Sequence, residues 1–240
     1  MNKAIVLGVG PVDGLGGQLA VRFAASGHHV FIAGRTQTSL DELASVIEGN
    51  GGQATAVVTD ATNESSIVNL LETVDAKTGD LTLAIYNAGN NTPGRIIEMD
   101  ADYFERSWRV LCFGGFLFGR ETLRRMQGSG GTLLFTGASA SMRGRPGFGA
   151  FNSGKSALRI LAQAMAKEYG PDGIHVGHVV VDGPIGGEKI RSAFPEYAEK
   201  LGDAGMISIS GIVDAFEYLY QQPHNAWTFE VDVRTSIEEW

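Results

Sequence analysis

Short runs of consecutive apolar residues alternate with segments of helical periodicity along the chain, and this alternation constrains the fold more than any other feature. The runs predict strands, and because they are continuous, we expect helices to cover both faces of the sheet that they form. Strands that alternate with helices are typical of a parallel sheet. Strands are predicted at residues 5–7, 29–33, 54–58, 81–86, 131–136, 175–181 and 227–233.

The segments between these strands read as helices. The helix at 103–126 is weakened in its middle by Gly114 and Gly115, and the helix that ends near residue 48 is expected to start at a Thr38 or Ser39 cap. No repeat or composition shift marks a linker, and 240 residues with 43% apolar content suit one large domain, although two small ones remain compatible. The remaining helices are predicted at 18–25, 65–77, 151–169, 188–201 and 211–220.

Charge and composition exclude several classes of function. The net charge of −8 and the lack of a Lys/Arg cluster argue against a nucleic-acid partner and against binding to a membrane surface. The single cysteine, Cys112, rules out an internal disulfide. No apolar run approaches the length of a membrane span or of the apolar region of a signal peptide, so we expect a cytoplasmic protein.

A glycine-rich stretch, Gly8-Val9-Gly10-Pro11-Val12-Asp13-Gly14-Leu15-Gly16-Gly17, joins the first strand to the first helix. Glycines let the backbone turn sharply and let a ligand approach the amides at a helix N-terminus, where the helix dipole favours a phosphate. Such a turn can also serve only as a connection. In a doubly wound α/β sheet, however, ligands bind across the carboxyl ends of the strands, where this stretch lies.

The strand ends, taken together, resemble the short-chain dehydrogenase/reductase family. Asp60 follows the third strand, Asn87-Ala88-Gly89 follows the fourth, and Asp182-Gly183-Pro184-Ile185 follows the sixth, in the order and spacing of that family. The resemblance implies a single-domain, doubly wound Rossmann fold of about seven parallel strands, with helices on both faces, that binds a nicotinamide dinucleotide. It implies these cofactor-binding residues: Gly10, Gly14, Leu15, Gly16, Arg35, Thr36, Asp60, Ala61, Asn87, Ala88, Gly89, Lys155, Gly183 and Ile185.

Arg35 indicates which nicotinamide cofactor the chain binds. A site for NAD places a carboxylate just after the second strand, where it accepts a hydrogen bond from the ribose 2′-hydroxyl. This chain has Gly34, Arg35 and Thr36 there. A guanidinium can hold a 2′-phosphate with paired hydrogen bonds, so NADP(H) is favoured, although Arg35 also fits a solvated surface residue.

The chain departs from the family at the residues that do the chemistry. Family members usually carry Tyr-x-x-x-Lys, in which the tyrosine donates a proton, with a serine about 13 residues earlier and an asparagine on the preceding long helix. Here Lys155 is present, but Phe151 stands in place of the tyrosine, Ala138 in place of the serine and Leu111 in place of the asparagine. The usual division between acid–base catalysis and oxyanion stabilisation is therefore missing.

Three residues are candidates for catalysis in this altered site: Lys155, Ser139 and Asp182. A shift of one residue brings Ser139 into the serine role. Asp182 follows the sixth strand and, if buried, is able to act as an acid, although a turn residue that accepts a backbone amide is the more ordinary role. Asn152 shares a helix face with Lys155 but is a poor acid, and Ser153 faces away from it.

The substrate is expected to contact residues 90–97, the loop at 141–148 and a lid at about 186–206 that follows Gly186-Gly187. The two arginines of the loop, Arg143 and Arg145, can meet an anionic group, but solvent exposure is the simpler expectation. No histidine receives a role, and no cluster has the spacing of a metal site. Apolar residues predict an apolar pocket: Phe148, Phe151, Ile185, Phe194 and Met206.

Two functions from different classes follow from this pattern. The first is an NADP(H)-dependent oxidoreductase with a non-standard proton donor, acting on a conjugated C=C bond or a carbonyl of a small apolar substrate. The second is a catalytically inactive NADP(H)-binding protein with a regulatory or scaffolding role. A homodimer or homotetramer is also expected, packed through the two long helices. Its apolar surface is assigned to Phe104, Trp108, Phe113, Phe116 and Phe118.

Overall fold

The computed structural model describes residues 1–91 and 93–238 and contains a seven-stranded parallel sheet in the order β3-β2-β1-β4-β5-β6-β9. Every neighbouring pair in this sheet is parallel, as the continuous apolar runs predicted. The change of direction between β1 and β4 is the switch point of a doubly wound fold. The strands are β1 (Lys3–Leu7), β2 (His29–Gly34), β3 (Gln53–Val58), β4 (Leu81–Tyr86), β5 (Gly131–Thr136), β6 (Ile174–Asp182) and β9 (Glu230–Arg234).

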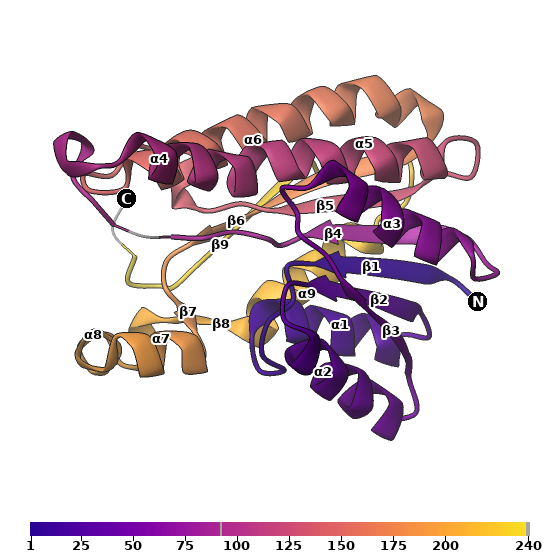
Figure 1. Cartoon of the computed structure of the whole chain (residues 1–240), viewed down its shortest axis with the longest axis horizontal. Coiled ribbons are helices and arrows are strands. Elements are labelled where there is room, and N and C mark those ends of the chain that lie inside the picture. Colours follow the sequence, from indigo (N-terminus) through magenta and orange to yellow (C-terminus); the bar gives the residue numbers. More distant parts are fainter. Residues whose placement is uncertain (92, 239–240) are drawn as a thin grey trace.

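Helices cover both faces of the sheet, as Figure 1 shows. One face packs against α1 (Leu15–Ala25), α2 (Gln37–Gly49) and α9 (Ile209–Tyr220). The other packs against α3 (Glu64–Asp75), α5 (Gly114–Met126) and α6 (Gly149–Tyr169), and α4 (Ala101–Trp108) packs against α6. Each face buries its own apolar cluster, so that alternate residues of one strand belong to opposite cores: in β5, Leu133 and Phe135 face α5 and α6, whereas Leu134 faces α9.

The long helix predicted at 103–126 contains a π-helical turn, Arg109–Phe113, between α4 and α5. The buried hydroxyl of Tyr86 donates a hydrogen bond of 2.6 Å to the carbonyl of Val110 in this turn. A side chain on Gly114 would lie closer than 3.0 Å to the Tyr86 hydroxyl. Gly114 therefore allows the helix to approach β4, rather than only weakening it.

Residues 186–206 form two short helices instead of the single helix predicted at 188–201. They are α7 (Glu188–Ala193) and α8 (Pro195–Leu201), and the break falls at Phe194 because a residue before proline disfavours the helical conformation. The ends of this segment are joined by a two-stranded sheet of β7 (Ile185–Gly186) and β8 (Ile207–Ser208), which the sequence did not reveal.

Two further boundaries differ from the prediction. Helix α2 begins after Thr36, two residues before the expected cap, and Thr36 makes no side-chain capping bond there. The last strand covers Glu230–Arg234 and not 227–233. Within residues 1–91 and 93–238, no helix combines the length and the apolar character that crossing a membrane requires.

Candidate active site at the carboxyl ends of the strands

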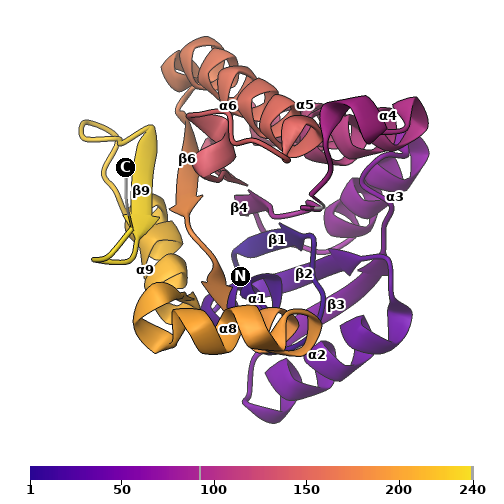
Figure 2. The ribbon, with the colours of Figure 1, turned by 90° about the vertical axis from the view of Figure 1, so that its left-hand side faces the viewer.

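The residues expected to bind a cofactor follow the carboxyl ends of β1, β2, β3, β4 and β6, and therefore meet along one edge of the parallel sheet. Figure 2 looks onto this edge, with α6 and α4 on one side of it and α7 and α8 on the other. The arrangement brings together the ends of β1 and β6, which are 175 residues apart in sequence.

The glycine-rich stretch after β1 is held by close backbone approaches. Gly8 has φ +103°, and a side chain on it would lie closer than 3.0 Å to the backbone of Ala88. A Cβ on Gly16 would lie 2.6 Å from the Gly8 carbonyl, whereas nothing lies within 4 Å of a Cβ placed on Gly10. Helix α1 starts at Leu15, and its N-cap Gly14 offers no capping side chain, so the first amides of the helix stay available to an anion.

Asn87 fastens this stretch to the neighbouring strands. Its Nδ2 donates to the Gly8 carbonyl at 2.9 Å, and its Oδ1 accepts from the hydroxyl of Thr136 at 2.9 Å. The side chain therefore joins the ends of β1, β4 and β5. Ala88 and Gly89 continue from it along the same edge, and a Cβ on Gly89 would lie 3.7 Å from Nζ of Lys155.

The ends of β2 and β3 provide the other half of the edge. Gly34 lets β2 pass the Val9 carbonyl oxygen, which would lie 2.5 Å from a Cβ at this position. Arg35 and Thr36 are exposed, and the guanidinium of Arg35 has no hydrogen bond or ion pair within the described part of the chain. Asp60 accepts from the amide and hydroxyl of Thr62, both at 2.8 Å, in a turn that exposes its carboxylate.

The turn at Asp60 lies just before helix α3 but does not cap it. The cap of α3 is Asn63, whose side chain accepts from the amide of Ser66, and Asp60 is not the cap. Ala61 is buried beneath the turn, and its carbonyl faces Gly114. Asp60 consequently has a carboxylate oxygen that the helix does not use.

Lys155 lies buried in the first half of α6. Its Nζ donates to the carbonyl of Thr136 at 2.6 Å, and burial lowers the pKa of its ammonium to about 8. The ring of Phe151, one turn earlier on the same helix face, has its centroid 6.0 Å from this Nζ. Leu111 is fully buried and packs against Gly154, so an apolar side chain fills this part of the site.

Ser139 opens a short 3-10 turn, Ser139–Ser141, directly after β5. Both serines are buried, and the Ser141 hydroxyl accepts from the amide of Ala138 at 3.2 Å. That hydrogen bond from Ala138 to Ser141 stabilises the turn. The hydroxyl of Ser139 takes no part in it.

Asp182 forms a buried ion pair that neither of its expected roles included. Its carboxylate is almost fully buried and accepts two-pronged hydrogen bonds of 2.8–3.2 Å from the guanidinium of Arg143. Arg234 of β9 lies 3.8 Å away, and Glu238 lies 3.6 Å from Arg143. Both carboxylate oxygens are engaged by the guanidinium of Arg143, which argues against Asp182 as a proton donor. Arg143 is accordingly half-buried rather than a solvated residue, whereas Arg145 is exposed as expected.

The segments expected to contact the substrate lie side by side. The amide of Gly94 donates to the Gly147 carbonyl at 2.7 Å, which joins the 90–97 segment to the 141–148 loop; position 92 lies outside the described residues. Phe148, Phe151 and Ile185 are half-buried. Of the other two expected pocket residues, Met206 is buried and Phe194 is 58% exposed. Gly183, with φ +155°, leads into Ile185.

One buried polar cluster escaped the sequence analysis. His178 of β6 is fully buried, and its Nδ1 lies 2.9 Å from the carboxylate of Glu230 on β9. Arg159 of α6 holds the same carboxylate with bonds of 2.6 and 2.8 Å. The three residues are up to 71 positions apart and fit no motif, so only the fold brings them together.

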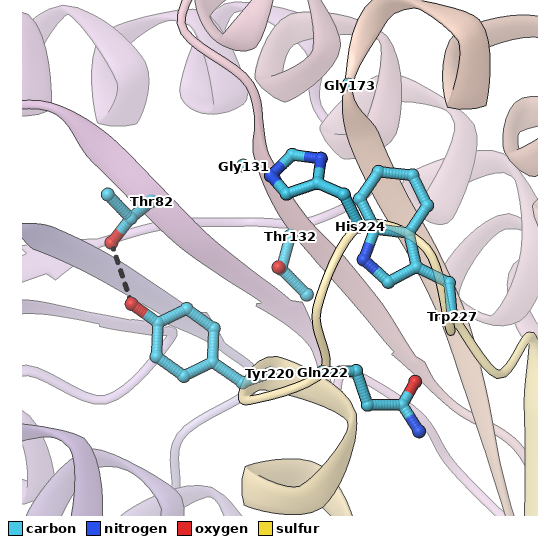
Figure 3. A pocket seen from close by; sticks show the side chains of 8 residues that line it. All are labelled: Thr82, Gly131, Thr132, Gly173, Tyr220, Gln222, His224 and Trp227. Atoms are coloured by element: carbon cyan, nitrogen blue, oxygen red, sulfur yellow. Dashed lines mark hydrogen bonds between the residues drawn. The ribbon is translucent and has the colours of Figure 1, made fainter.

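A hollow of about 300 Å³ lies at the opposite edge of the sheet, where β4 and β5 begin. Figure 3 shows it between Thr82, Tyr220, His224 and Trp227. The Tyr220 hydroxyl bonds to Thr82 and His28, and Gln222 bonds to Thr228 at both ends of its amide. These polar groups are thus engaged within the protein. Among the residues described, no group of His, Cys, Asp and Glu has the arrangement of a metal site.

Comparison with known proteins agrees with this geometry. Residues 3–188 match the family model described as short chain dehydrogenase. The chain is 30% identical over 193 residues to the uncharacterized oxidoreductase YuxG of Bacillus subtilis, and 30% identical over 177 residues to a 3beta-hydroxysteroid dehydrogenase of Mediterraneibacter gnavus. These matches cover 79% and 72% of this chain, but only 28% and 63% of the two relatives.

Solved structures extend the similarity to nearly the full length. A short-chain dehydrogenase from Rhodopseudomonas palustris is 36% identical with a TM-score of 0.83, and the match covers 97% of this chain and 98% of that one. An alcohol dehydrogenase from Thermococcus sibiricus, complexed with 5-hydroxy-NADP, has a TM-score of 0.85 at 20% identity over 100% and 99% of the two chains, a likeness in fold. The chain belongs to the short-chain dehydrogenase/reductase family.

Proposed function

We propose that the protein is an NADP(H)-dependent oxidoreductase, built as one domain over residues 1–240, whose site works without the usual tyrosine. The observation that carries the proposal is the coexistence of two features. They are the open glycine-rich stretch at residues 8–17, here called the glycine cradle, and the buried Lys155. The cradle leaves room at Gly10 and free amides at the start of α1, and Lys155 lies beside Gly89 at the end of β4.

The residues along this edge fit a dinucleotide. Gly10, Gly14, Leu15 and Gly16 would hold the diphosphate, and the free Oδ2 of Asp60 would meet the adenine edge, next to Ala61. Asn87, Ala88 and Gly89 would lie under the ribose and nicotinamide, with Lys155, Gly183 and Ile185 around them. When bound, the cofactor supplies or accepts a hydride. Arg35, exposed and without a partner among the described residues, supports NADP(H) because its guanidinium is free to bind a 2′-phosphate.

Lys155 is the proton donor of this proposal. Its ammonium uses one N–H for the Thr136 carbonyl and retains two others. Because burial lowers its pKa to about 8, the group is protonated near pH 7 and releases its proton more readily than an exposed lysine. Ser139 polarises the substrate oxygen, and Asp182 serves to fix Arg143 in the substrate wall.

A conjugated C=C bond suits this site better than an isolated ketone. Hydride addition to the conjugated bond gives a delocalised enolate, which accepts its proton from Lys155, and a strong acid at the reacting oxygen is less necessary. Phe148, Phe151 and Leu111 favour an apolar body for the substrate. The segment 186–206, joined at its base by β7 and β8, acts as the lid.

Oxidation of NADPH over panels of enones, enoyl thioesters and ketones tests this proposal, with a direct NADPH titration beside it. We expect turnover on the conjugated substrates, abolished in Lys155→Met and retained in Asp182→Asn. The variant Phe151→Tyr should add ketone reduction. Turnover that survives in Lys155→Met would overturn the role of this residue.

One observation favours the second candidate function, a catalytically inactive NADP(H)-binding protein with a regulatory or scaffolding role. Phe151 and Leu111 place apolar groups on both sides of Lys155, where the family carries polar ones. Tight NADPH binding without turnover on any panel would support this candidate.

We also propose a homodimer or homotetramer packed through the long helices. Phe104, Trp108 and Phe116 are each 37–39% exposed, and Ile160 of α6 is 59% exposed. Phe118, which the sequence analysis added to this surface, is fully buried in the core, and Phe113 is half-buried. A monomer in light scattering at micromolar concentration would refute this assembly.

A further inference from the structure

His178 is a buried titratable group that the proposed chemistry leaves unused. It lies on β6, packs under α6, and stacks on Phe229 with centroids 6.3 Å apart and planes within 8°. Its Nδ1 meets Glu230, which Arg159 of α6 holds by two hydrogen bonds. The charged groups that face His178 are therefore Glu230 from β9, with Arg159 and Lys155 from α6.

The partners of His178 determine its tautomer. Burial alone would raise the pKa of Glu230, but hydrogen bonds from His178 and Arg159 outweigh this effect and lower it to about 2, so the carboxylate is ionised. Burial also lowers the pKa of His178, which keeps the imidazole neutral. A neutral ring beside a carboxylate carries its proton on Nδ1, and Nε2 is then a bare acceptor.

That acceptor has no hydrogen-bond partner in the described structure, although it is fully buried. An unsatisfied buried polar atom costs about 1–3 kcal/mol, and such atoms concentrate where function requires them. A phenylalanine would fill the same space without that cost. The position of His178 therefore calls for an explanation beyond packing.

His178 packs against Gly137, next to the backbone carbonyl that binds Lys155. A Cβ on Gly137 would lie closer than 3.0 Å to two atoms of the imidazole, so this ring determines where Gly137 passes. The preceding residue, Thr136, provides the carbonyl that binds Nζ of Lys155 at 2.6 Å, and Ser139 lies two residues after Gly137. Arg159 lies one turn beyond Lys155 on the same helix face.

We propose that His178 is a positioning residue for Lys155: its ring sets the path of the Thr136–Gly137 backbone, and its bare Nε2 edge presents a negative dipole to the buried ammonium. Glu230 and Arg159 hold the ring in this tautomer. The inference rests on the proposed function of Lys155 as proton donor, and it assigns the control of that proton to a residue that never touches substrate.

The test is an NMR titration of the full-length protein labelled at lysine Cε, without substrate or cofactor. The chain has only six lysines, and the signal that disappears in Lys155→Met identifies Lys155. We expect a wild-type midpoint of about 8. In His178→Phe the midpoint should fall by about half a pH unit or more, because the negative edge is lost. In His178→Gln, which can donate to Glu230 and still offer an oxygen, it should return toward the wild-type value.

The matched control is His175→Phe. His175 is also a buried histidine of β6, but it lies on the other face of the sheet and stacks on Trp227. It should leave the Lys155 midpoint unchanged. If His178→Phe does not fold, Gly137→Ala displaces the ring from the other side and should move the midpoint too.

An unchanged Lys155 midpoint in His178→Phe, or an equal shift in His175→Phe, would overturn the inference. The titration needs no turnover, so it remains decisive if the protein reduces no substrate on any panel. Conversely, loss of turnover in Lys155→Met together with an unmoved midpoint in His178→Phe would leave the proposed function intact and remove His178 from it.

Discussion

The two halves of the sheet are held together by different kinds of contact. Around β1, β2 and β4, backbone meets backbone: Gly8, Gly16 and Gly34 allow contacts that any side chain would block. Around β5, β6 and β9, polar and charged side chains meet instead, in the Asp182–Arg143 pair at the end of β6 and in the Glu230–His178–Arg159 cluster at the middle of β6 and the start of β9. The first half suits a ligand recognised by amides, and the second holds its side chains in fixed positions.

The difference indicates which substitutions each half of the sheet tolerates. A backbone cradle fails when a methyl group is added, because the neighbouring carbonyls cannot move away. A buried ion pair fails when one partner is removed, because the other charge stays buried without compensation. The predictions below test these two modes of failure, from the largest expected effect to the smallest.

Removal of the Asp182 carboxylate should have the largest effect. In Asp182→Ala, Arg143 and Arg234 lose their buried counter-charge, and we expect the free energy of unfolding to fall by about 3 kcal/mol in urea denaturation. The control is Asp203→Ala, whose carboxylate pairs with Arg191 but is 92% exposed, and it should cost less than about 0.5 kcal/mol. Equal losses in both variants would contradict the special status of Asp182.

Acid should lower the free energy of unfolding through two residues of the half around β5, β6 and β9, first His178 and then Glu230. Burial lowers the pKa of His178 in the folded state. Below about pH 6.5 the unfolded chain therefore binds a proton at this residue more readily than the folded chain does, and the free energy of unfolding falls as the pH drops. The pKa of Glu230 is lowered to about 2, so its contribution is full above about 4.5 and is lost as the pH falls toward 2.

Glu230→Gln isolates the second of these effects. We expect this variant to lose about 2 kcal/mol at pH 7 and to show a flatter decline in stability below pH 4.5 than the wild type, measured by urea denaturation at each pH. A decline as steep as that of the wild type would show that other carboxylates cause the acid sensitivity.

Glycine substitutions examine the cradle. In Gly16→Ala the new Cβ would lie 2.6 Å from the Gly8 carbonyl, and we expect a loss of about 1–2 kcal/mol of stability together with weaker NADPH binding. Gly10→Ala meets nothing within 4 Å, so it should keep its stability and weaken NADPH binding alone. Thermal unfolding and fluorescence titration measure the two quantities, and a stable Gly16→Ala would refute the close approach.

Arg35→Ala should have the smallest effect on the molecule. We expect an unchanged melting temperature, a dissociation constant for NADPH raised about tenfold, and almost no change for NADH. The physical reason is the loss of a guanidinium from the 2′-phosphate alone. Equal effects on both cofactors, measured by titration, would refute the preference for NADP(H).

Local patterns were enough to predict the sheet and the position of the cradle. Continuous apolar runs at 81–86 and 131–136 coincide with β4 and β5, and the family resemblance is confirmed by the match over residues 3–188. The division of the helix predicted at 188–201 was missed, although Pro195 carries the signal because it restricts Phe194. The cofactor and catalytic roles of single residues stay predictions.

Contacts between distant side chains could not be predicted. The Asp182–Arg143 pair spans 39 positions and the His178–Glu230 pair spans 52, and no local pattern specifies which strand ends become neighbours. The π-helical turn depends on the Tyr86 hydroxyl reaching Val110, which only the packed sheet makes possible. An aspartate with no visible partner therefore looked like a possible acid, although the fold supplies a cation to it.

The small sheet of β7 and β8 has a consequence for how the protein can diversify. It pairs Ile185 with Ile207 and Gly186 with Ser208, so the two ends of the segment between them lie side by side. A loop whose ends are fixed together can change in length or sequence at low entropic cost, because the closure is already made. This segment can thus be exchanged between relatives while the Rossmann framework stays unchanged.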